Sequence, residues 1–136
     1  MKITSKSEYA VISMIYLGER YDKDEYVSLN DIAQDNNLSI KYLEKIFADL
    51  KKADFFISGR GKVGGYKLKR KPDEYTMYEI MKAAEGRVSP VQCLETGVCK
   101  NGICISYPLW HDMFELEKDF LKKKTLKDYI RGVNND

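Results

Sequence analysis

Apolar residues recur at helical spacing in the first half of the chain and predict three successive helices. Residues 1–20 carry an apolar face that predicts the first helix. Ser28, with Asp31 three residues later, is a capping-box-like start for a short second helix. Ser39 is placed to cap the third, which continues to Lys52. Its packed face is formed by Ile40, Leu43, Ile46, Phe47 and Leu50.

The pattern then changes from helical to β-prone. Phe55–Ser58 and Tyr66–Leu68 flank a basic segment with four glycines, which predicts a β-hairpin. Thr76 and Glu79 form a capping box for a fourth helix, which Gly86 closes. The order of helix, helix, helix and hairpin is that of a winged helix-turn-helix. We therefore expect a mainly α fold with a small β-hairpin.

The last third of the chain contains one more periodic stretch. Residues 87–104 show no convincing period, whereas Ser106 and Pro108 begin a long amphipathic helix. One apolar stripe runs along it, made of Leu109, Met113, Leu116 and Phe120 and widened by Trp110, Phe114 and Leu121. The helix either folds back on the core or forms a dimer interface, and we favour the interface, built from Leu109, Trp110, Met113, Leu116 and Phe120.

These elements divide the 136 residues into three parts. We predict a DNA-binding domain over 1–86, a cysteine-bearing sensor loop over 87–106, and a dimerisation helix with its tail over 107–136. A hydrophobic content of 43% argues against disorder. No segment resembles a membrane span or an export signal, so a cytoplasmic location is expected. No glycine motif for phosphates and no base-nucleophile pair is found, so we expect no enzyme.

The net charge of +2 hides a sorted distribution. Residues 1–40 hold four Lys/Arg against seven Asp/Glu, residues 41–71 hold ten against three, and residues 72–136 hold nine against eleven. A basic block between acidic ends is typical of a domain that presents one face to a polyanion. A solvated lysine-rich face would give the same charge pattern.

The helix-turn-helix interpretation places the start of the third helix in a DNA major groove. Its candidate DNA-binding residues are Ser39, Lys41, Tyr42, Glu44 and Lys45. Lysine donates to guanine or phosphate, and glutamate accepts from cytosine. Tyr42 fits the packed face of the helix equally well.

The hairpin tip adds two more DNA-binding candidates. Arg60 stands between two glycines, where its guanidinium can reach a minor groove or a phosphate, and Lys62 follows. A loop arginine that only raises solubility is the alternative. The basic residues of the block predict binding that weakens strongly with salt.

Cys93, Cys99 and Cys104 are the three cysteines of the chain, in the pattern C-x5-C-x4-C. An odd number in a cytoplasmic protein argues against a disulfide framework. A loop that bears Gly97 and Gly102 can wrap three thiolates around a metal centre. The spacing alone leaves an iron-sulfur cluster, zinc, a thiol switch and inert cysteines all open.

Several of these motifs together resemble a winged-helix family of bacterial transcription regulators, which includes the iron-sulfur cluster regulator, the nitric-oxide-sensing repressor and the cysteine-metabolism repressor. The resemblance covers almost the whole chain. The motifs are the opening T-S-K-x-x-Y-A-V, the helix S-I-K-Y-L-E-K-I-F, the wing R-G-x-x-G-G-Y-x-L, the cysteine loop and P-L-W-H-D-M.

The resemblance implies that Cys93, Cys99 and Cys104 hold an iron-sulfur cluster, most simply 2Fe-2S. It also implies that Lys41 and Glu44 read bases and that Arg60 is the wing arginine. The cysteine-metabolism branch lacks the three cysteines. We expect a homodimer, and its two-fold symmetry predicts a palindromic operator.

The chain departs from this pattern at the fourth cluster ligand. Where the cluster regulator has a histidine after its last cysteine, this chain has Tyr107, and its sole histidine is His111 within the last helix. By the resemblance, Glu8 matches the position of an acidic residue in the nitric-oxide-sensing branch. There the partner subunit supplies this residue as the fourth ligand of the cluster. An exposed helix carboxylate is the alternative role of Glu8. The last cysteine gap is four residues instead of five, and Lys41 replaces a serine.

The resulting hypothesis is a regulator that senses cluster status, nitric oxide or redox conditions. In this hypothesis the cluster orders the loop and shifts the recognition helices relative to their half-sites. The rivals are a cluster-free winged helix that responds to thiol oxidation or to a partner protein of cysteine metabolism, a zinc-stabilised module, and an electron-transfer protein.

Overall fold

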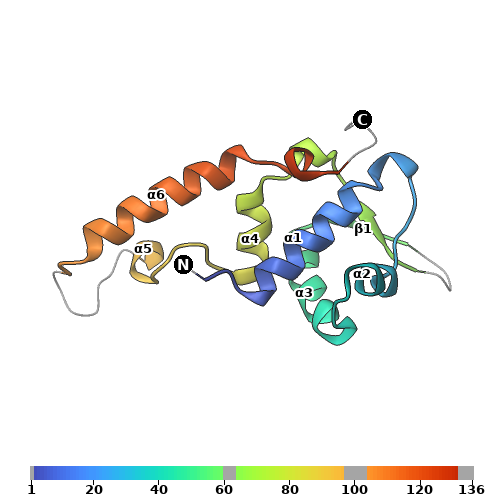
Figure 1. Cartoon of the computed structure of the whole chain (residues 1–136), viewed down its shortest axis with the longest axis horizontal. Coiled ribbons are helices and arrows are strands. Elements are labelled where there is room, and N and C mark those ends of the chain that lie inside the picture. The colour runs from blue at the N-terminus through green and yellow to red at the C-terminus, as the bar shows by residue number, and fades with distance from the viewer. Residues whose placement is uncertain (1, 60–63, 97–103, 132–136) are drawn as a thin grey trace.

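The computed structural model describes residues 2–59, 64–96 and 104–131 (Figure 1). The predicted helices and the hairpin form in the expected order, and a mainly α winged-helix fold is confirmed. Arg60, Lys62 and Cys99 lie outside the described residues. The elements are α1 (Ser5–Gly18), α2 (Leu29–Asn36), α3 (Ile40–Lys52), β1 (Phe56–Ser58), β2 (Tyr66–Leu68), α4 (Met77–Glu85), α5 (Cys93–Thr96) and α6 (Tyr107–Lys123).

Side-chain caps set where the helices of the DNA-binding domain begin. The hydroxyls of Ser28, Ser39 and Thr76 each accept a backbone N–H from the third residue beyond, as the sequence predicted. Thr4 caps α1 in the same way. Gly86, with φ of 79°, ends α4 in a left-handed conformation that glycine adopts without strain.

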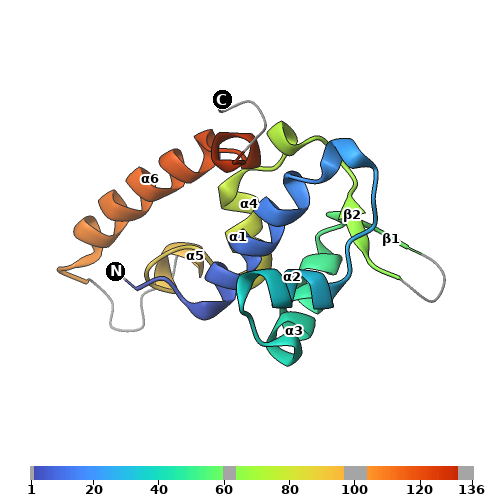
Figure 2. The ribbon, with the colours of Figure 1, turned by 45° about the vertical axis from the view of Figure 1, so that its right-hand side comes forward.

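The core lies between α1, α3 and α4, with α2 and the hairpin closing its sides (Figure 2). The apolar face of α3 is buried as its spacing predicts, since Leu43, Ile46, Phe47 and Leu50 are at most 2% exposed. The core residues of the other elements include Ala10, Met14, Leu17, Ile32, Phe55, Tyr75, Ile80 and Leu126. The opposite face of α3 is thereby left to solvent.

The hairpin is antiparallel and pairs Phe56 with Leu68 and Ser58 with Tyr66. Val27 adds a further bridge to Tyr66, with both backbone hydrogen bonds at 2.8 Å. Gly65 has a φ of 121°, and a Cβ there would come within 2.7 Å of the Val27 carbonyl oxygen. Only glycine therefore allows this close approach between the hairpin and the segment before α2.

Tyr75 joins the hairpin to α4 and is fully buried. Its hydroxyl accepts the backbone N–H groups of Lys69 and Arg70 at 3.1 and 3.0 Å and donates to the Phe55 carbonyl at 2.7 Å. The Arg70 guanidinium lies 4.2 Å from the centre of the Tyr75 ring and pairs with Glu79 at 2.6 Å. The end of the hairpin is thus fixed to the first turns of α4.

The segment after α6 returns to the DNA-binding domain, a contact that the sequence pattern did not predict. Leu126 is fully buried in the core, and Thr125 forms a β-bridge with Thr76. Arg131 donates its backbone N–H and its guanidinium to the Glu19 carboxylate at the end of α1. The C-terminal end of α6 is therefore anchored to the core.

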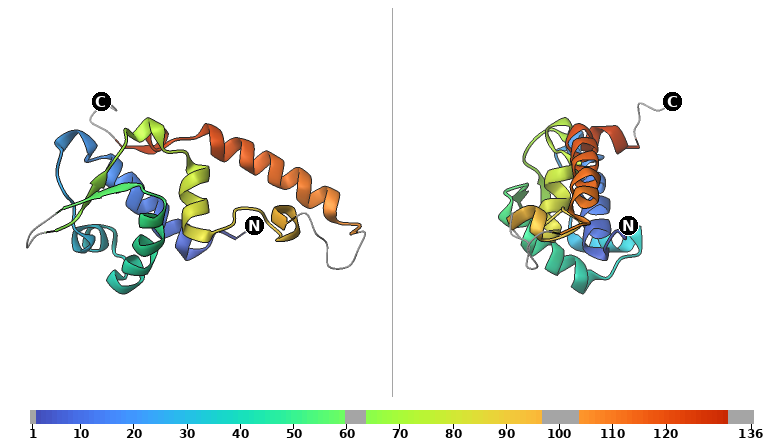
Figure 3. Two further views of the ribbon diagram at one scale, coloured as in Figure 1. Left: turned by 180° about the vertical axis from the view of Figure 1, so that it is seen from behind. Right: turned by 90° about the vertical axis from the view of Figure 1, so that its left-hand side faces the viewer.

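α6 packs on α4 and extends away from it, so that α5 and the start of α6 lie at one end of the molecule and the hairpin at the other (Figure 3). The predicted apolar stripe separates into two faces. Phe114 is 8% exposed and Leu121 packs on the core, whereas Leu109, Leu116 and Phe120 stay exposed. In the described parts of the chain, no helix has the length and apolar character of a membrane span.

Candidate DNA-binding surface and cysteine segment

α2 and α3 meet across a short turn that a left-handed residue makes possible. Asn37 has φ of 55° and ψ of 50°, a conformation that asparagine tolerates better than most residues. The backbone N–H of Ser39 then donates to the Tyr9 hydroxyl at 3.0 Å. This contact fixes the start of α3 against α1.

The outward face of α3 presents the predicted polar residues. Lys41, Glu44 and Lys45 are exposed. Ser39 is also exposed, and its hydroxyl caps the helix by accepting the backbone N–H of Tyr42. Tyr42 differs from these because it is half-buried and its ring meets that of Tyr9 edge-on, with centroids 4.9 Å apart. The ring of Tyr42 thus supports the packing of α3 on α1.

The basic residues that follow the hairpin tip are largely paired with carboxylates. Lys67 lies 2.5 Å from Asp24, and Lys69 lies 2.7 Å from Asp54. The hydrogen bond that Lys67 donates to the Asp24 carboxylate raises the pKa of Lys67. These carboxylates are 84% and 75% exposed, so the pairs are weakly held and a DNA phosphate can compete for the lysines.

The cysteine segment connects α4 to α6. Cys93 begins α5, Cys104 lies two residues before Ser106 at the start of α6, and both cysteines are half-buried. Cys99 belongs to the part that is not described. Within residues 2–59, 64–96 and 104–131, no three His, Cys, Asp or Glu side chains group together as metal ligands.

The two candidate fourth ligands occupy different elements. Glu8 is exposed in the first turn of α1, which is tied to the end of α4 because Thr4 and Ser7 both donate to the Glu85 carboxylate. His111 is exposed on α6, where its ring stacks on that of Tyr107 at a centroid distance of 5.9 Å.

Sequence reasoning missed Glu85, which holds the end of α4, where the cysteine segment begins, against the first turn of α1. A carboxylate in the last turn of a helix is unfavourable towards the helix dipole, and this could have signalled a tertiary partner. It also missed the side-chain contacts of Ser106, whose position before Pro108 was interpreted only as a helix start.

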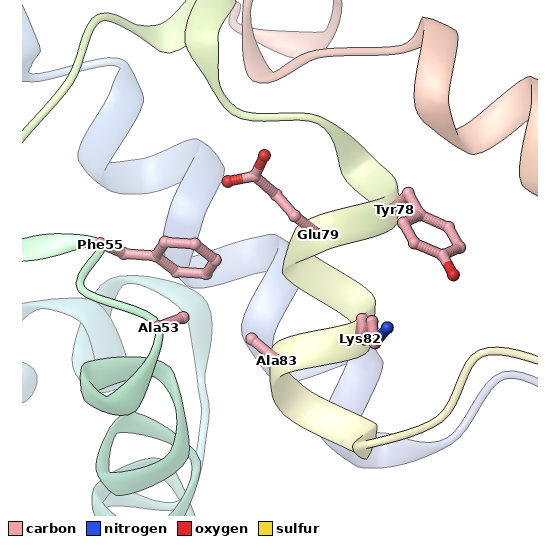
Figure 4. Close-up of a pocket in the computed structure, with 6 residues that line it drawn as sticks. All are labelled: Ala53, Phe55, Tyr78, Glu79, Lys82 and Ala83. Carbon is pink, nitrogen blue, oxygen red and sulfur yellow. The ribbon is translucent and has the colours of Figure 1, made fainter.

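An open cleft of about 400 Å³ lies between the end of α3, the start of β1 and α4 (Figure 4). Its walls are formed by Ala53, Phe55, Tyr78, Glu79, Lys82 and Ala83. Glu79 is held by Arg70, and the lining contains no nucleophile beside a base.

A helix-turn-helix with an exposed polar recognition face and a hairpin beside it defines a winged-helix DNA-binding regulator. The chain belongs to the Rrf2 family, described as iron-dependent transcriptional regulators, whose model matches residues 3–132.

Known proteins support this assignment. The transcriptional regulator IscR of Photobacterium profundum is 33% identical over 135 residues, which are 98% of this chain and 78% of the relative. The IscR of Aliivibrio salmonicida is 35% identical over 137 residues, 100% of this chain and 80% of the relative. CymR, the global cysteine regulator of B. subtilis, has a similar structure with a TM-score of 0.79 at 35% identity, covering 95% of each chain.

The structure of IscR from T. potens aligns with a TM-score of 0.77 at 29% identity, covering 95% of this chain and 85% of the other. These relatives are transcription regulators and not enzymes, which agrees with the sequence prediction. The protein is therefore a DNA-binding transcription regulator.

Proposed function

We propose that the protein is a homodimeric regulator that senses cluster status, nitric oxide or redox conditions through an iron-sulfur cluster held by Cys93, Cys99 and Cys104. The observation that carries the proposal is the position of Cys93 and Cys104, half-buried, on the connection between α4 and α6. A group bound there acts directly on the link between the DNA-binding domain and the long helix.

The donor atoms suit such a cluster. Cysteine thiolates are its usual ligands, and Cys93 and Cys104 supply two of them from half-buried positions. Cys99 supplies the third. A bound cluster, 2Fe-2S by the family resemblance, provides one-electron redox chemistry at a potential that the surrounding residues set.

Glu8 is our candidate for the fourth ligand, contributed to the cluster of the partner subunit. The contacts of Thr4 and Ser7 with Glu85 support this role, because they tie the turn that carries Glu8 to the root of the cysteine segment. A carboxylate that ligates across the dimer links cluster state to the relative position of the two DNA-binding domains. His111 is the alternative ligand.

Two features support the binding of a palindromic operator. The exposed polar face of α3 is available to a major groove. The DNA-binding residues that we propose at the start of α3 are Ser39, Lys41, Tyr42, Glu44 and Lys45. Arg60 and Lys62 extend the contact from the wing. A two-fold dimer presents two such faces. Its interface is formed by the apolar stripe of α6, namely Leu109, Trp110, Met113, Leu116 and Phe120. Leu109, Leu116 and Phe120 are exposed, with Leu116 at 75%, and Trp110 and Met113 are half-buried.

Anaerobic purification with iron and sulfide analysis and a visible spectrum tests this function. We expect a coloured wild-type protein, loss of colour in Cys93→Ala and Cys99→Ala, and an altered spectrum in Glu8→Ala. Glu25→Ala is the matched control, since Glu25 is an exposed acid in the connector before α2. A colourless wild-type protein that still binds palindromic DNA would contradict the cluster.

A cluster-free regulator is the second candidate, and one comparison favours it. The oxidised form of Staphylococcus aureus CymR aligns with a TM-score of 0.78 at 30% identity, covering 99% of this chain. By this alternative, oxidation of a cysteine pair or a partner protein of cysteine metabolism controls DNA binding. A colourless protein whose DNA affinity changes with peroxide would support it.

A further inference from the structure

Ser106 stands at the N-cap of α6 without capping the helix through its side chain. A serine at this position normally accepts a backbone N–H of the first turn. The hydroxyls at the corresponding positions of the other long helices do so, namely Thr4, Ser28, Ser39 and Thr76. The Ser106 hydroxyl is therefore committed to a different contact.

That contact lies between Cys104 and Trp110. The Ser106 Oγ is 3.1 Å from the Cys104 Sγ, and it accepts the indole N–H of Trp110 at 2.8 Å. An indole nitrogen is a donor only, so this bond uses a lone pair of the oxygen and leaves the hydroxyl hydrogen for the sulfur. A cysteine sulfur that binds metal is a thiolate, which accepts hydrogen bonds.

The backbone holds the same three residues together. The Tyr107 N–H donates to the Cys104 carbonyl at 3.2 Å, and the Trp110 N–H donates to the Ser106 carbonyl at 3.3 Å. Cys104, Ser106 and Trp110 are all half-buried, which limits competition from water. The sulfur of Cys104 is thereby connected to the first turn of α6 through the hydroxyl of Ser106.

We propose that Ser106 is a positioning residue for the third cysteine, donating a hydrogen bond to the Cys104 thiolate while Trp110 fixes the orientation of its hydroxyl. The inference rests on the proposed cluster. Hydrogen bonds to ligand sulfurs stabilise the reduced cluster and orient the ligand. Removal of the donor makes the cluster harder to reduce and weakens its retention, and Trp110 conveys the state of the sulfur to α6.

The test compares anaerobically prepared wild type with Ser106→Ala, Ser106→Thr and the control Ser58→Ala, an exposed serine of β1. The readouts are the midpoint potential, the rate of cluster loss and the fluorescence of Trp110, the single tryptophan of the chain. We expect Ser106→Ala to have a more negative potential and to lose cluster about tenfold faster. Ser106→Thr, which keeps the hydroxyl, restores both.

The cluster-free protein provides a second readout. Loss of the hydrogen-bond acceptor shifts the Trp110 emission to shorter wavelength in Ser106→Ala but not in Ser58→Ala. If Ser106→Ala takes up no cluster, Trp110→Phe replaces it, because phenylalanine keeps an aromatic ring at this position and removes the N–H donor that orients the hydroxyl. Its potential is then more negative than that of the wild type, and an unchanged potential would overturn the role of Trp110 in orienting the hydroxyl.

The outcomes separate this inference from the proposed function. A wild type that takes up no cluster overturns both. A cluster-loaded wild type whose potential, rate of cluster loss and emission are all matched by Ser106→Ala overturns the role of Ser106 and leaves the cluster intact. An equal change in Ser106→Thr and Ser106→Ala also overturns it, since a hydroxyl is then not what the site requires.

Discussion

Tyr75 connects two parts of the DNA-binding domain through one hydroxyl group. Replacement of Tyr75 by phenylalanine removes three hydrogen bonds. The Lys69 N–H and the Phe55 carbonyl still bond to each other at 3.1 Å, whereas the Arg70 N–H loses its partner. A donor left without its partner in a partly buried site destabilises the fold, so we expect the free energy of unfolding to fall by about 1 to 3 kcal/mol. Urea unfolding at a fixed protein concentration measures the change.

The matched control for this prediction is Tyr26→Phe, because the Tyr26 side chain is 43% exposed. Its stability should stay within about 0.5 kcal/mol of the wild type. A similar loss in the two variants would show that the buried hydroxyl of Tyr75 has no special role.

Burial and the hydrogen bond that Tyr16 donates to Asp35 raise the pKa of Tyr16 to about 12, which keeps its phenol protonated.

At the scale of elements, α6 carries one apolar face that packs on the core and one that is exposed, and we propose the exposed face as the dimer interface. We expect the double variant Leu116→Glu/Phe120→Glu to be monomeric in analytical ultracentrifugation, because both side chains belong to the exposed stripe. Its affinity for a palindromic operator should fall on the order of 100-fold, since the two half-sites are then bound separately. Near-native helix content by circular dichroism checks the fold.

Glu115→Lys is the control for the α6 variant. Glu115 is exposed on the side of the helix away from the stripe and pairs only with Lys118 among the described contacts. This change should leave the dimer intact. Dimers in the double variant would refute the role assigned to the stripe.

The same scale shows what the sequence could predict. The caps at Ser28, Ser39 and Thr76 and the hairpin strands were predictable because their signals are local. The bridge between Thr76 and Thr125 was not, because it pairs residues far apart in the chain. Periodicity placed the apolar residues of α6 on the helix, but it could not tell which of them pack on α4.

The candidate site was predictable to a similar extent. Residue types and spacing indicated the polar face of α3 and the cysteine segment. The pairing of Lys67 with Asp24 and of Lys69 with Asp54 could not be predicted, since each pair joins two segments that only the fold brings together. The link from Cys104 through Ser106 to Trp110 depends on side-chain orientation, which no period encodes.

At the scale of the whole molecule, we predict that DNA binding depends on a small set of exposed cations. If about five phosphates are neutralised per subunit, the logarithm of the binding constant falls with the logarithm of salt concentration with a slope of about 4 to 5. Lys41→Ala should reduce this slope by about 1 per subunit. Fluorescence anisotropy at several salt concentrations measures the slope.

Lys127→Ala provides the comparison, because Lys127 is an exposed cation in the segment after α6, outside the predicted DNA-binding residues. Its salt slope should equal that of the wild type. Equal slopes for Lys41→Ala and the wild type would remove Lys41 from the contact with DNA.

The chain after α6 returns to the core at Leu126, so Leu126 is the fixed point, or pivot, about which α6 can tilt. α6 has 17 residues and is therefore about 25 Å long, with its C-terminal end fixed to the core. A tilt of about 10° at the pivot displaces the far end, next to Cys104, by about 4 Å. In the proposed mechanism, a modest rearrangement around the cysteines reaches the DNA-binding domain as a small rotation, and Leu126 determines where that rotation is applied.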